Sequence, residues 1–367
     1  MSLYLIVFCI IAVCFAVEII LQKRQLSDKI GRGLLIGTLI LITTLLSFRY
    51  GEGSDYLSYE KIYNGYFEVS SFHGFLDTWR NGIISEVGFC FLLWILAMLH
   101  VPYTIFLAGL AILEAFLLYR FIDRYTKGGF RCFTLLMLYP SFIFIYEFSA
   151  MRQGLSMALF LGVLLPLLEQ KKWIPYYIIA ALCFLMHRTS LIYLVCPLAI
   201  LFSTKLVEIL TGIALAGGIV YTLVRYVTEG RLTISVSSFV LRIGICIVVI
   251  VSYHHIKAEE HFTWFYRIAL GGMAAYFVFA QSPFWAARVS DTVRFIDVII
   301  IVQFMKCLKK QVLFVVSLLL TLYAGGLLCK NLETRARSGM IDTIHAYNYP
   351  YFTIFQKEQV SDYLIKQ

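Results

Sequence analysis

Long apolar runs separated by short polar stretches follow one another along most of the chain. A helix needs about 20 apolar residues to cross a bilayer, and many of the runs come close to that length. A membrane β-barrel would instead need alternating strands of about 10 residues, a pattern that the sequence lacks. We therefore predict an all-α, polytopic integral membrane protein with about 11–13 transmembrane helices and short outward-facing loops. The predicted spans are residues 3–21, 33–48, 103–119, 132–146, 154–168, 206–224, 234–253, 263–280 and 311–328, two short crossings within 173–204, and two weaker candidates, 84–100 and 289–305.

Composition agrees with a membrane protein. Hydrophobic residues make up 60% of the 367 residues, charged residues make up 14%, and the mean hydropathy is +0.81. A soluble globular protein is about half apolar and about a quarter charged. The net charge of +9 does not indicate a nucleic-acid partner, and we expect none, because basic cytoplasmic loops produce such an excess. The nine cysteines lie singly in the apolar runs, so we expect neither a disulfide framework nor a metal site.

The basic residues orient the predicted spans. Residues 22–32 and 306–310 are rich in lysine and arginine, which marks them as cytoplasmic. The loop 49–83 then lies outside, as do the later polar breaks in the apolar runs. Residues 120–131 are also basic, but two full crossings before them would place them outside as well. We therefore interpret 84–100 as a re-entrant or interfacial helix.

No internal repeat and no soluble domain interrupts this pattern. Residues 1–330 are predicted to form a single multi-pass membrane domain that includes the outward-facing loop 49–83, and residues 331–367 a short C-terminal tail. Lys23 and Arg24 follow the first apolar run as a stop-transfer flank would, so we interpret this run as a span and not as a cleaved signal peptide.

Polar residues interrupt several apolar runs on the predicted outer side. Arg152 and Gln153 are such a break, and alone they fit an interface anchor and a helix-bridging amide. Several breaks on one side favour a shared cavity at membrane level. Guanidinium groups bind phosphate oxygens bidentately, so an arginine-rich cavity suits an anionic ligand such as a lipid pyrophosphate. The residues expected to converge there are Arg49, Asp55, Arg152, His187, Arg188, Arg288 and Arg294.

Other polar positions carry two interpretations each. His187 is either a helix–helix hydrogen-bonding residue or a general base. Glu114 is either a proton-relay site or, as we favour, the partner of an arginine or tyrosine on a neighbouring helix. The tyrosines on one face of 56–66 form either an interfacial belt or a platform for sugar rings. Arg288, Asp291, Arg294 and Asp297 are spaced for salt bridges along a helix.

Four short motifs occur in a characteristic order among the predicted helices: RYGEGSDYLSY (49–59), MRQGLSMALF (151–160), CFLMHRTSLIYL (183–194) and ARVSDTVRFIDVIIIVQF (287–304). Together they resemble the EpsG family of Wzy-type polysaccharide polymerases, from about residue 30 to residue 310. Thr292 stands where that family usually has tyrosine, and Arg188 is not part of the family pattern. The matching residues are Gly53, Asp55 and Tyr59 in a G-x-D-Y-x-x-Y element, Arg152–Gln153 as an R-Q pair, His187 and Ser190 in an H-x-S element, and Arg288 at the start of the late helix.

The resemblance implies a membrane glycosyltransferase in the bacterial cytoplasmic (inner) membrane. It would join undecaprenyl-diphosphate-linked oligosaccharide repeats into O-antigen, capsule or exopolysaccharide on the outer face, without a cofactor. The implied partners are the lipid-linked oligosaccharide, membrane lipid, and a chain-length regulator and a flippase of the same pathway. In this chemistry arginine holds the pyrophosphate, so that Arg152, with Asp55 or His187 as the base, is catalytic. The expected substrate-binding residues are Arg49, Gly53, Tyr56, Tyr59, Glu147, Gln153, Ser190, Arg288 and Arg294.

A flippase of lipid-linked oligosaccharide, or a polysaccharide exporter, is the alternative class. Such a transporter needs a polar path through the whole membrane, with charged residues in the middle of several spans. Only Glu114 and the residues from 288 to 297 meet this requirement. Because most polar breaks lie on one side, we prefer the polymerase.

Overall fold

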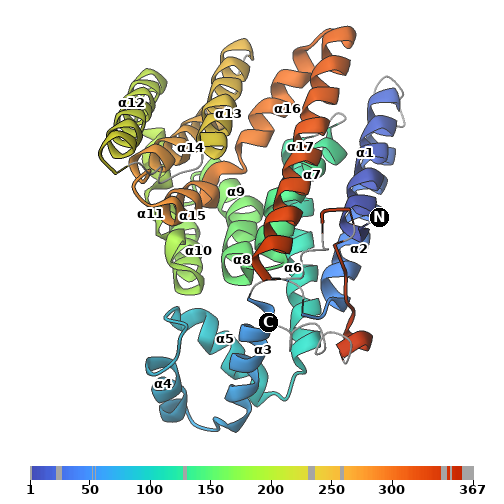
Figure 1. Cartoon of the computed structure of the whole chain (residues 1–367), viewed down its shortest axis with the longest axis vertical. Coiled ribbons are helices and arrows are strands. Elements are labelled where there is room, and N and C mark those ends of the chain that lie inside the picture. Colours follow the sequence, from blue (N-terminus) through green and yellow to red (C-terminus); the bar gives the residue numbers. More distant parts are fainter. Residues whose placement is uncertain are drawn as a thin grey trace. The chain divides into compact units, whose positions relative to one another are not determined.

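The computed structural model describes residues 2–21, 27–51, 53, 55–126, 130–229, 236–256, 260–339, 345–347 and 349–357 (Figure 1). These residues form helices and connecting turns, and the β-type pairing described among them is an isolated bridge between Arg49 and Thr353. The all-α fold class is therefore confirmed. Parts of the basic segment 22–32 and of the tail 331–367 lie outside the described residues.

Seven helical runs in the described ranges are long and apolar enough to cross a membrane, which confirms a multi-pass membrane protein. These runs are α1 (Leu3–Leu21), α2 (Ser27–Phe48), α6 (Tyr103–Tyr125), the run from α8 (Met151–Leu159) to α9 (Leu165–Glu169), α12 (Thr204–Glu229), α13 (Val236–His255) and α17 (Lys310–Gly339). The other α-helices are α3 (Tyr56–Gly65), α4 (Phe72–Arg80), α5 (Val87–Met98), α7 (Arg131–Leu138), α10 (Trp173–Met186), α11 (Ile192–Val195), α14 (Glu260–Val278), α15 (Pro283–Arg294) and α16 (Asp297–Cys307).

Two of the predicted spans change their helical pitch at a proline. After α7 the chain continues as a π-helix over Tyr139–Glu147, which contains Pro140. A second π-helical turn, Phe160–Leu164, lies between α8 and α9 and ends two residues before Pro166. Proline lacks a backbone N–H and clashes with the preceding turn, so the ordinary α-helical hydrogen bonding cannot continue through it. The first π-helix ends just before the Arg152–Gln153 break.

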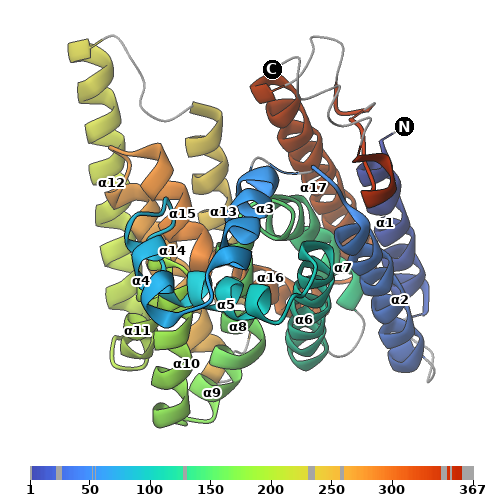
Figure 2. The same ribbon diagram turned by 90° about the horizontal axis from the view of Figure 1, so that it is seen from below.

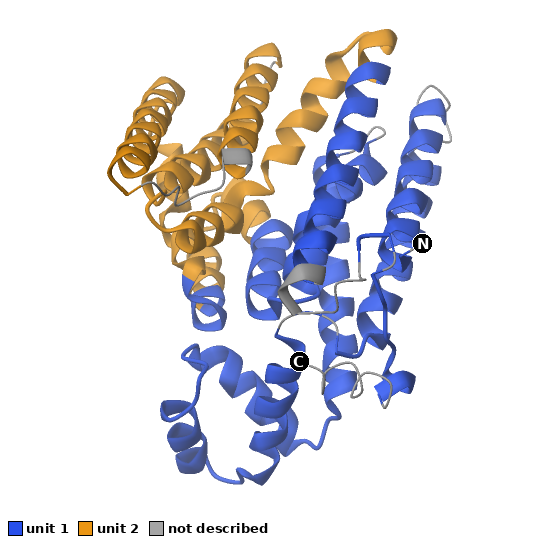
Figure 3. Cartoon of the chain, viewed as in Figure 1, with its two compact units in different colours: residues 1–163, 182–188, 314–367 blue, residues 164–181, 189–313 orange. Residues whose placement is uncertain are grey.

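The described chain divides into two compact units, each assembled from separate parts of the sequence (Figure 3). Unit 1 contains residues 1–163, 182–188 and 314–367, and unit 2 contains residues 164–181 and 189–313. In unit 1, α1, α2, α6 and α7 lie side by side (Figures 1 and 2). In unit 2, α14 packs against α12, α13, α15 and α16.

Ion pairs in unit 1 show which of its loops share an end. The buried side chain of Arg131 lies 2.8 Å from Asp123 and 2.8 Å from Asp28. Asp28 of the first basic segment and Asp123 and Arg131 of the second are therefore at the same end of this unit. Near the other end of α1, the ring of Tyr4 packs edge-on against Phe148, with centroids 5.5 Å apart.

The length of α5 explains why Arg131 lies at the same end as Asp28, although the two apolar runs 84–100 and 103–119 precede it. Helix α5 has 12 residues, which gives a length of about 18 Å. The hydrocarbon core of a bilayer is about 30 Å thick, so α5 is too short to cross it alone. With α5 not crossing, α6 returns the chain from the Arg49 end to the end that holds Asp28 and Arg131.

The loop 49–83 is mostly helical, and its tyrosines face inward. Tyr56, Tyr59, Tyr63 and Tyr66 are all buried and pack with Phe75, Phe89 and Trp94 from α4 and α5. The interpretation of this face as an open platform for sugars does not fit the structure. A helix presents residues three or four apart on one face whether that face meets a ligand or a core, and here it meets a core.

The C-terminal segment packs on unit 1. Helix α17 continues to Gly339, beyond the predicted boundary at residue 330. After it, the amide of Tyr50 donates to the carbonyl of Phe352 at 2.9 Å, and the hydroxyl of Tyr351 donates to Leu45 at 2.7 Å. The described part of the tail thus covers the end of α2, where Arg49 lies.

Candidate functional site

Gly53 brings two distant motifs together in unit 1. Its φ is +98°, a conformation that favours glycine. A Cβ at this position would overlap the carbonyl oxygen of Phe148 and lie 3.0 Å from the Cα of Ser149. Only glycine allows the loop to lie this close to the turn before α8. The G-x-D-Y loop therefore rests directly beside the segment that leads to Arg152.

Arg152 is held by two groups from other parts of unit 1. Its Nε donates a 2.8 Å hydrogen bond to the hydroxyl of Tyr59, and its guanidinium lies 5.6 Å from the centre of that ring. Its Nη1 pairs with Oε2 of Glu86. The guanidinium is thereby fixed in direction, while 19% of the side chain stays exposed. Arginine has five donors, and within the described part of the chain these contacts use two of them.

Glu86 is the centre of this cluster. Its Oε1 lies 3.6 Å from Nδ1 of His187 and 3.6 Å from Nε of Arg188. Ser85 donates to its Oε2 at 3.2 Å, and Arg188 in turn hydrogen-bonds Ser85. One carboxylate therefore faces Arg152, His187 and Arg188. We call these four residues the Glu86 cluster.

A second close approach by glycine makes the cluster possible. Gly88 lies in the first turn of α5, two residues after Glu86. A Cβ there would lie 2.7 Å from the Cβ of Leu185 and 2.9 Å from its carbonyl oxygen. The start of α5 can therefore approach the end of α10, which places Glu86 against the residues that follow Met186.

Electrostatics keep Glu86 ionised. Burial raises its pKa, but the Arg152 guanidinium, a backbone hydrogen bond, His187 and Ser85 lower it, and the pKa ends below the usual 4.5. Burial raises the pKa of Tyr59 against the opposing charge of Arg152. At neutral pH Arg152 is thus held between the Glu86 carboxylate and the protonated phenol of Tyr59.

Asp55 lies within electrostatic range of this cluster. Its charge acts on both Arg152 and Tyr59. It is the residue before α3 and is only half-buried, so it is accessible from solvent. The structure therefore brings Asp55, Tyr59, Arg152 and His187 of the expected site residues together in unit 1.

Four of the other expected residues in unit 1 point into its core. Gln153 and Tyr56 are each 1% exposed, and Tyr56 packs edge-on against Tyr103. Arg49 and Glu147 are each 2% exposed and interact electrostatically with each other and with Glu114. The expectation that Arg49 shares an open cavity with Arg152 does not match this burial. Arg49 is therefore enclosed beside these two glutamates in the core of unit 1.

Unit 2 holds the remaining expected residues. Asp291 lies 2.5 Å from Arg242 of α13 and 3.4 Å from Arg294, which confirms one salt bridge of the predicted ladder. The ladder is not one helix, because α15 ends at Arg294 and α16 begins at Asp297. Arg288 stacks on Phe284, with the guanidinium carbon 4.3 Å from the ring centre.

The hydroxyl groups of Thr292 and Ser190 lie inside unit 2. Thr292 donates to the carbonyl of Arg288 at 2.6 Å and contacts the hydroxyl of Thr189 at 3.1 Å. Ser190 is fully buried, and its hydroxyl has no hydrogen-bond partner among the residues that the structure describes. The boundary between the units falls between Arg188 and Thr189, so the H-x-S element is divided between them.

Glu86 is the residue that the motifs did not assign to the site. It was recognisable only as a carboxylate at the start of an apolar helix that is too short to cross the membrane. A carboxylate held at membrane level by a short helix needs a partner of opposite charge. This requirement was the signal in the sequence that could have identified Glu86. Its partners Arg152, His187 and Arg188 lie 66, 101 and 102 positions further along the chain.

Comparison with known proteins identifies the family. No curated protein and no solved structure matches the chain. The model of the EpsG family matches residues 34–341, a range that includes all four sequence motifs and the Glu86 cluster. Since this match covers most of the 367 residues, the chain belongs to the EpsG family.

Proposed function

We propose that this protein polymerises lipid-pyrophosphate-linked oligosaccharide repeats into a surface polysaccharide at the outer face of the bacterial cytoplasmic membrane. Membership of the EpsG family supports a polysaccharide polymerase-like role, and the helices make it a multi-pass membrane protein. The observation that carries the finer proposal is the Glu86 cluster. A fixed, partly exposed arginine lies there beside a histidine and a carboxylate.

Arg152 is suited to the leaving group. In the proposed reaction an acceptor sugar hydroxyl attacks the anomeric carbon, and the bond from that carbon to the pyrophosphate oxygen breaks with its electron pair. The pyrophosphate gains negative charge as it leaves. Nη2 of Arg152, which makes no hydrogen bond within the described residues, and the remaining N–H of Nη1 can donate to its oxygens. Tyr59 and Glu86 keep this fork in place before substrate arrives.

His187 is suited to take the proton of the acceptor hydroxyl. Glu86 faces Nδ1 at 3.6 Å, so a proton on Nδ1 would leave Nε2 as the basic nitrogen. Contacts of this kind are often long without substrate and shorten when it binds. Asp55, half-buried and within range of Arg152, is the second candidate base.

The experiment follows chain extension by purified protein in detergent, with lipid-linked repeat as the only substrate. Losing the bidentate contact of Arg152 should cost about 2–4 kcal/mol of transition-state stabilisation, or roughly 30- to 1000-fold in rate. Arg152→Lys keeps the charge but not the planar fork, so it should also lose most activity. Arg80→Ala, an exposed arginine on α4, is the matched control and should behave as wild type.

The result also separates the two classes of function. A transporter in detergent would move lipid-linked repeats without forming a glycosidic bond, so it would yield no ladder of longer products. If Arg152→Ala gives ladders like those of wild type, Arg152 only anchors its helix at the membrane interface. If folded wild-type protein yields no ladder, the proposal that the protein is a polymerase is wrong.

A further inference from the structure

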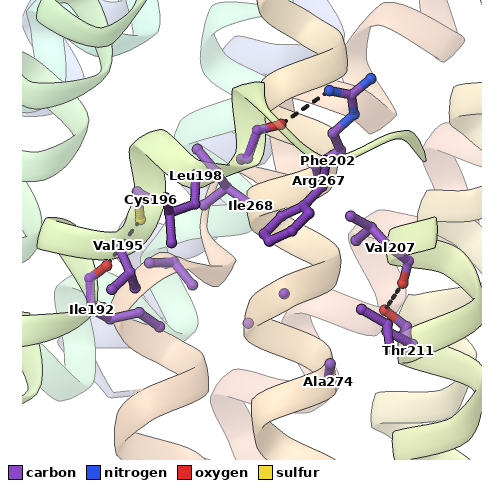
Figure 4. A pocket seen from close by; sticks show the side chains of 15 residues that line it. Ile192, Val195, Cys196, Leu198, Phe202, Val207, Thr211, Arg267, Ile268 and Ala274 are labelled. Atoms are coloured by element: carbon purple, nitrogen blue, oxygen red, sulfur yellow. Dashed lines mark hydrogen bonds between the residues drawn. The ribbon is translucent and has the colours of Figure 1, made fainter. Parts of the chain in front are cut away.

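An apolar pocket lies within unit 2, and its lining includes none of the residues to which the proposed reaction gives a role. It has a volume of about 290 Å³ and is lined by the segment from Ile192 to Phe202, by α12 and by α14 (Figure 4). Its lining includes the apolar side chains of Val195, Leu198, Phe202, Leu210 and Ile268. A volume near 300 Å³ is at the lower end of ordinary ligand pockets.

The pocket opens to the surroundings of unit 2. The side chains of Val195, Leu198, Phe202 and Leu210 at its rim are between 43% and 52% exposed. A Cβ added to Gly271 would meet nothing within 4 Å, whereas one added to Gly272 would lie 2.5 Å from Val293. Gly271 therefore leaves space in the pocket. In a membrane protein, apolar side chains exposed in this way face lipid chains.

Arg267 closes one end of the pocket (Figure 4). Its Nε donates to the hydroxyl of Thr204 at 3.1 Å, and its Nη1 donates to the carbonyl of Ala199 at 3.0 Å. These contacts fix the guanidinium but do not neutralise it. Among the described residues, no carboxylate forms an ion pair with it, because Glu208 of α12 binds Tyr266 and His254 instead.

We propose that this pocket holds one acyl chain of an anionic phospholipid, with the lipid phosphate bound to Arg267. A cation at membrane depth is costly unless an anion or water balances it. A phosphate accepts the planar fork of arginine, and the attached chain would fill the apolar space beside it. Lys205, exposed next to Thr204, adds a second positive charge at the same end.

The expected topology agrees with this ligand. The basic residue Lys205 is predicted to lie on the cytoplasmic side, together with residues 254–261. Anionic phospholipids attract such basic groups at the cytoplasmic leaflet. The lipid would therefore be a resident of the inner leaflet that stabilises unit 2, and it would be distinct from the substrate of the proposed polymerase.

Native mass spectrometry of the purified, delipidated full-length protein tests this site. The probes are phosphatidylglycerol and phosphatidylcholine with identical acyl chains. Both lipids carry the phosphate, but only phosphatidylcholine also carries a choline cation, which Arg267 and Lys205 repel. Wild type should therefore bind one phosphatidylglycerol about tenfold more tightly than phosphatidylcholine. Arg267→Gln should remove this preference. Gly271→Leu should fill the pocket and weaken both lipids, while Gly212→Leu, at an open glycine on α12 outside the lining, should match wild type.

Every outcome decides the proposal. Equal binding of the two lipids by wild type, or unchanged binding by Gly271→Leu, would overturn it. If Arg267→Gln fails to fold, because it also loses the contact with Ala199, the Gly271→Leu result still decides. Tighter binding of undecaprenyl phosphate that shows the same sensitivity to both variants would replace the phospholipid by a polyprenyl lipid and refute our assignment.

Discussion

Replacing Glu86 by glutamine tests whether its charge holds the cluster together. The side chain keeps its size and a hydrogen-bond acceptor, but Arg152 loses its counter-charge. The two side chains are only 7% and 19% exposed, so water screens the pair weakly. A hydrogen bond to a charged group contributes about 1.5–3 kcal/mol, and the charge left behind adds a penalty. We expect Glu86→Gln to lower the free energy of unfolding by about 2–3 kcal/mol.

The remaining contacts of Glu86 add little to this value. His187 and Arg188 each lie 3.6 Å away, and the Arg188 side chain is 62% exposed. An exposed pair of this kind contributes about 0–1 kcal/mol. Most of the loss should therefore come from Arg152.

The ion pair between Glu86 and Arg152 makes the free energy of unfolding depend on pH. The pKa of Glu86 in the folded protein lies below the usual 4.5 because of Arg152 and its other partners. As the pH falls, the unfolded state therefore binds the proton first. The stabilisation is complete above 4.5 and is lost as the pH falls through the folded pKa. The gap between wild type and Glu86→Gln should be constant above about pH 5 and should close below pH 4.5.

Thermal unfolding of purified protein in detergent, followed by circular dichroism across this pH range, measures the gap. Glu60→Gln is the matched control, because Glu60 lies 4.0 Å from the half-exposed Lys357 and outside the cluster. It should cost no more than about 1 kcal/mol. If Glu86→Gln unfolds like wild type, or if its gap persists in acid, then Arg152 is held by other groups and our account is wrong.

Three further predictions concern the loop, the base and the topology. Gly53→Ala should destabilise the protein by about 1–3 kcal/mol in the same unfolding assay, because of its positive φ and the clash with Phe148. Gly65→Ala, at an open glycine, should not. His187→Gln should abolish polysaccharide in cells while the amount of membrane protein stays normal, since an amide cannot act as a base; normal polymer length would leave Asp55 as the base. Ser58→Cys, on the exposed face of α3 in a cysteine-free background, should react with an impermeant maleimide in intact cells. Labelling only after lysis would invert the topology.

The sequence by itself determined the membrane class, the position of most helices and the family. These features depend on local properties, such as the length of an apolar run. The predicted span 3–21 coincides with α1, and the predicted span 103–119 lies within α6. Polar breaks in such runs are equally visible in the sequence, so Arg152 and His187 were recognisable without the structure.

Only the tertiary structure decided which charges meet. Arg49 and Arg152 look alike in the sequence, but Arg49 is buried with Glu114 and Glu147, while Arg152 stays partly exposed beside Glu86. Whether an arginine is free for a ligand depends on the carboxylates around it. For Arg152 that carboxylate is Glu86, which lies 66 residues away, directly before α5. No local pattern encodes such a partner, because it follows from how helices pack, including the close approaches that Gly53 and Gly88 allow.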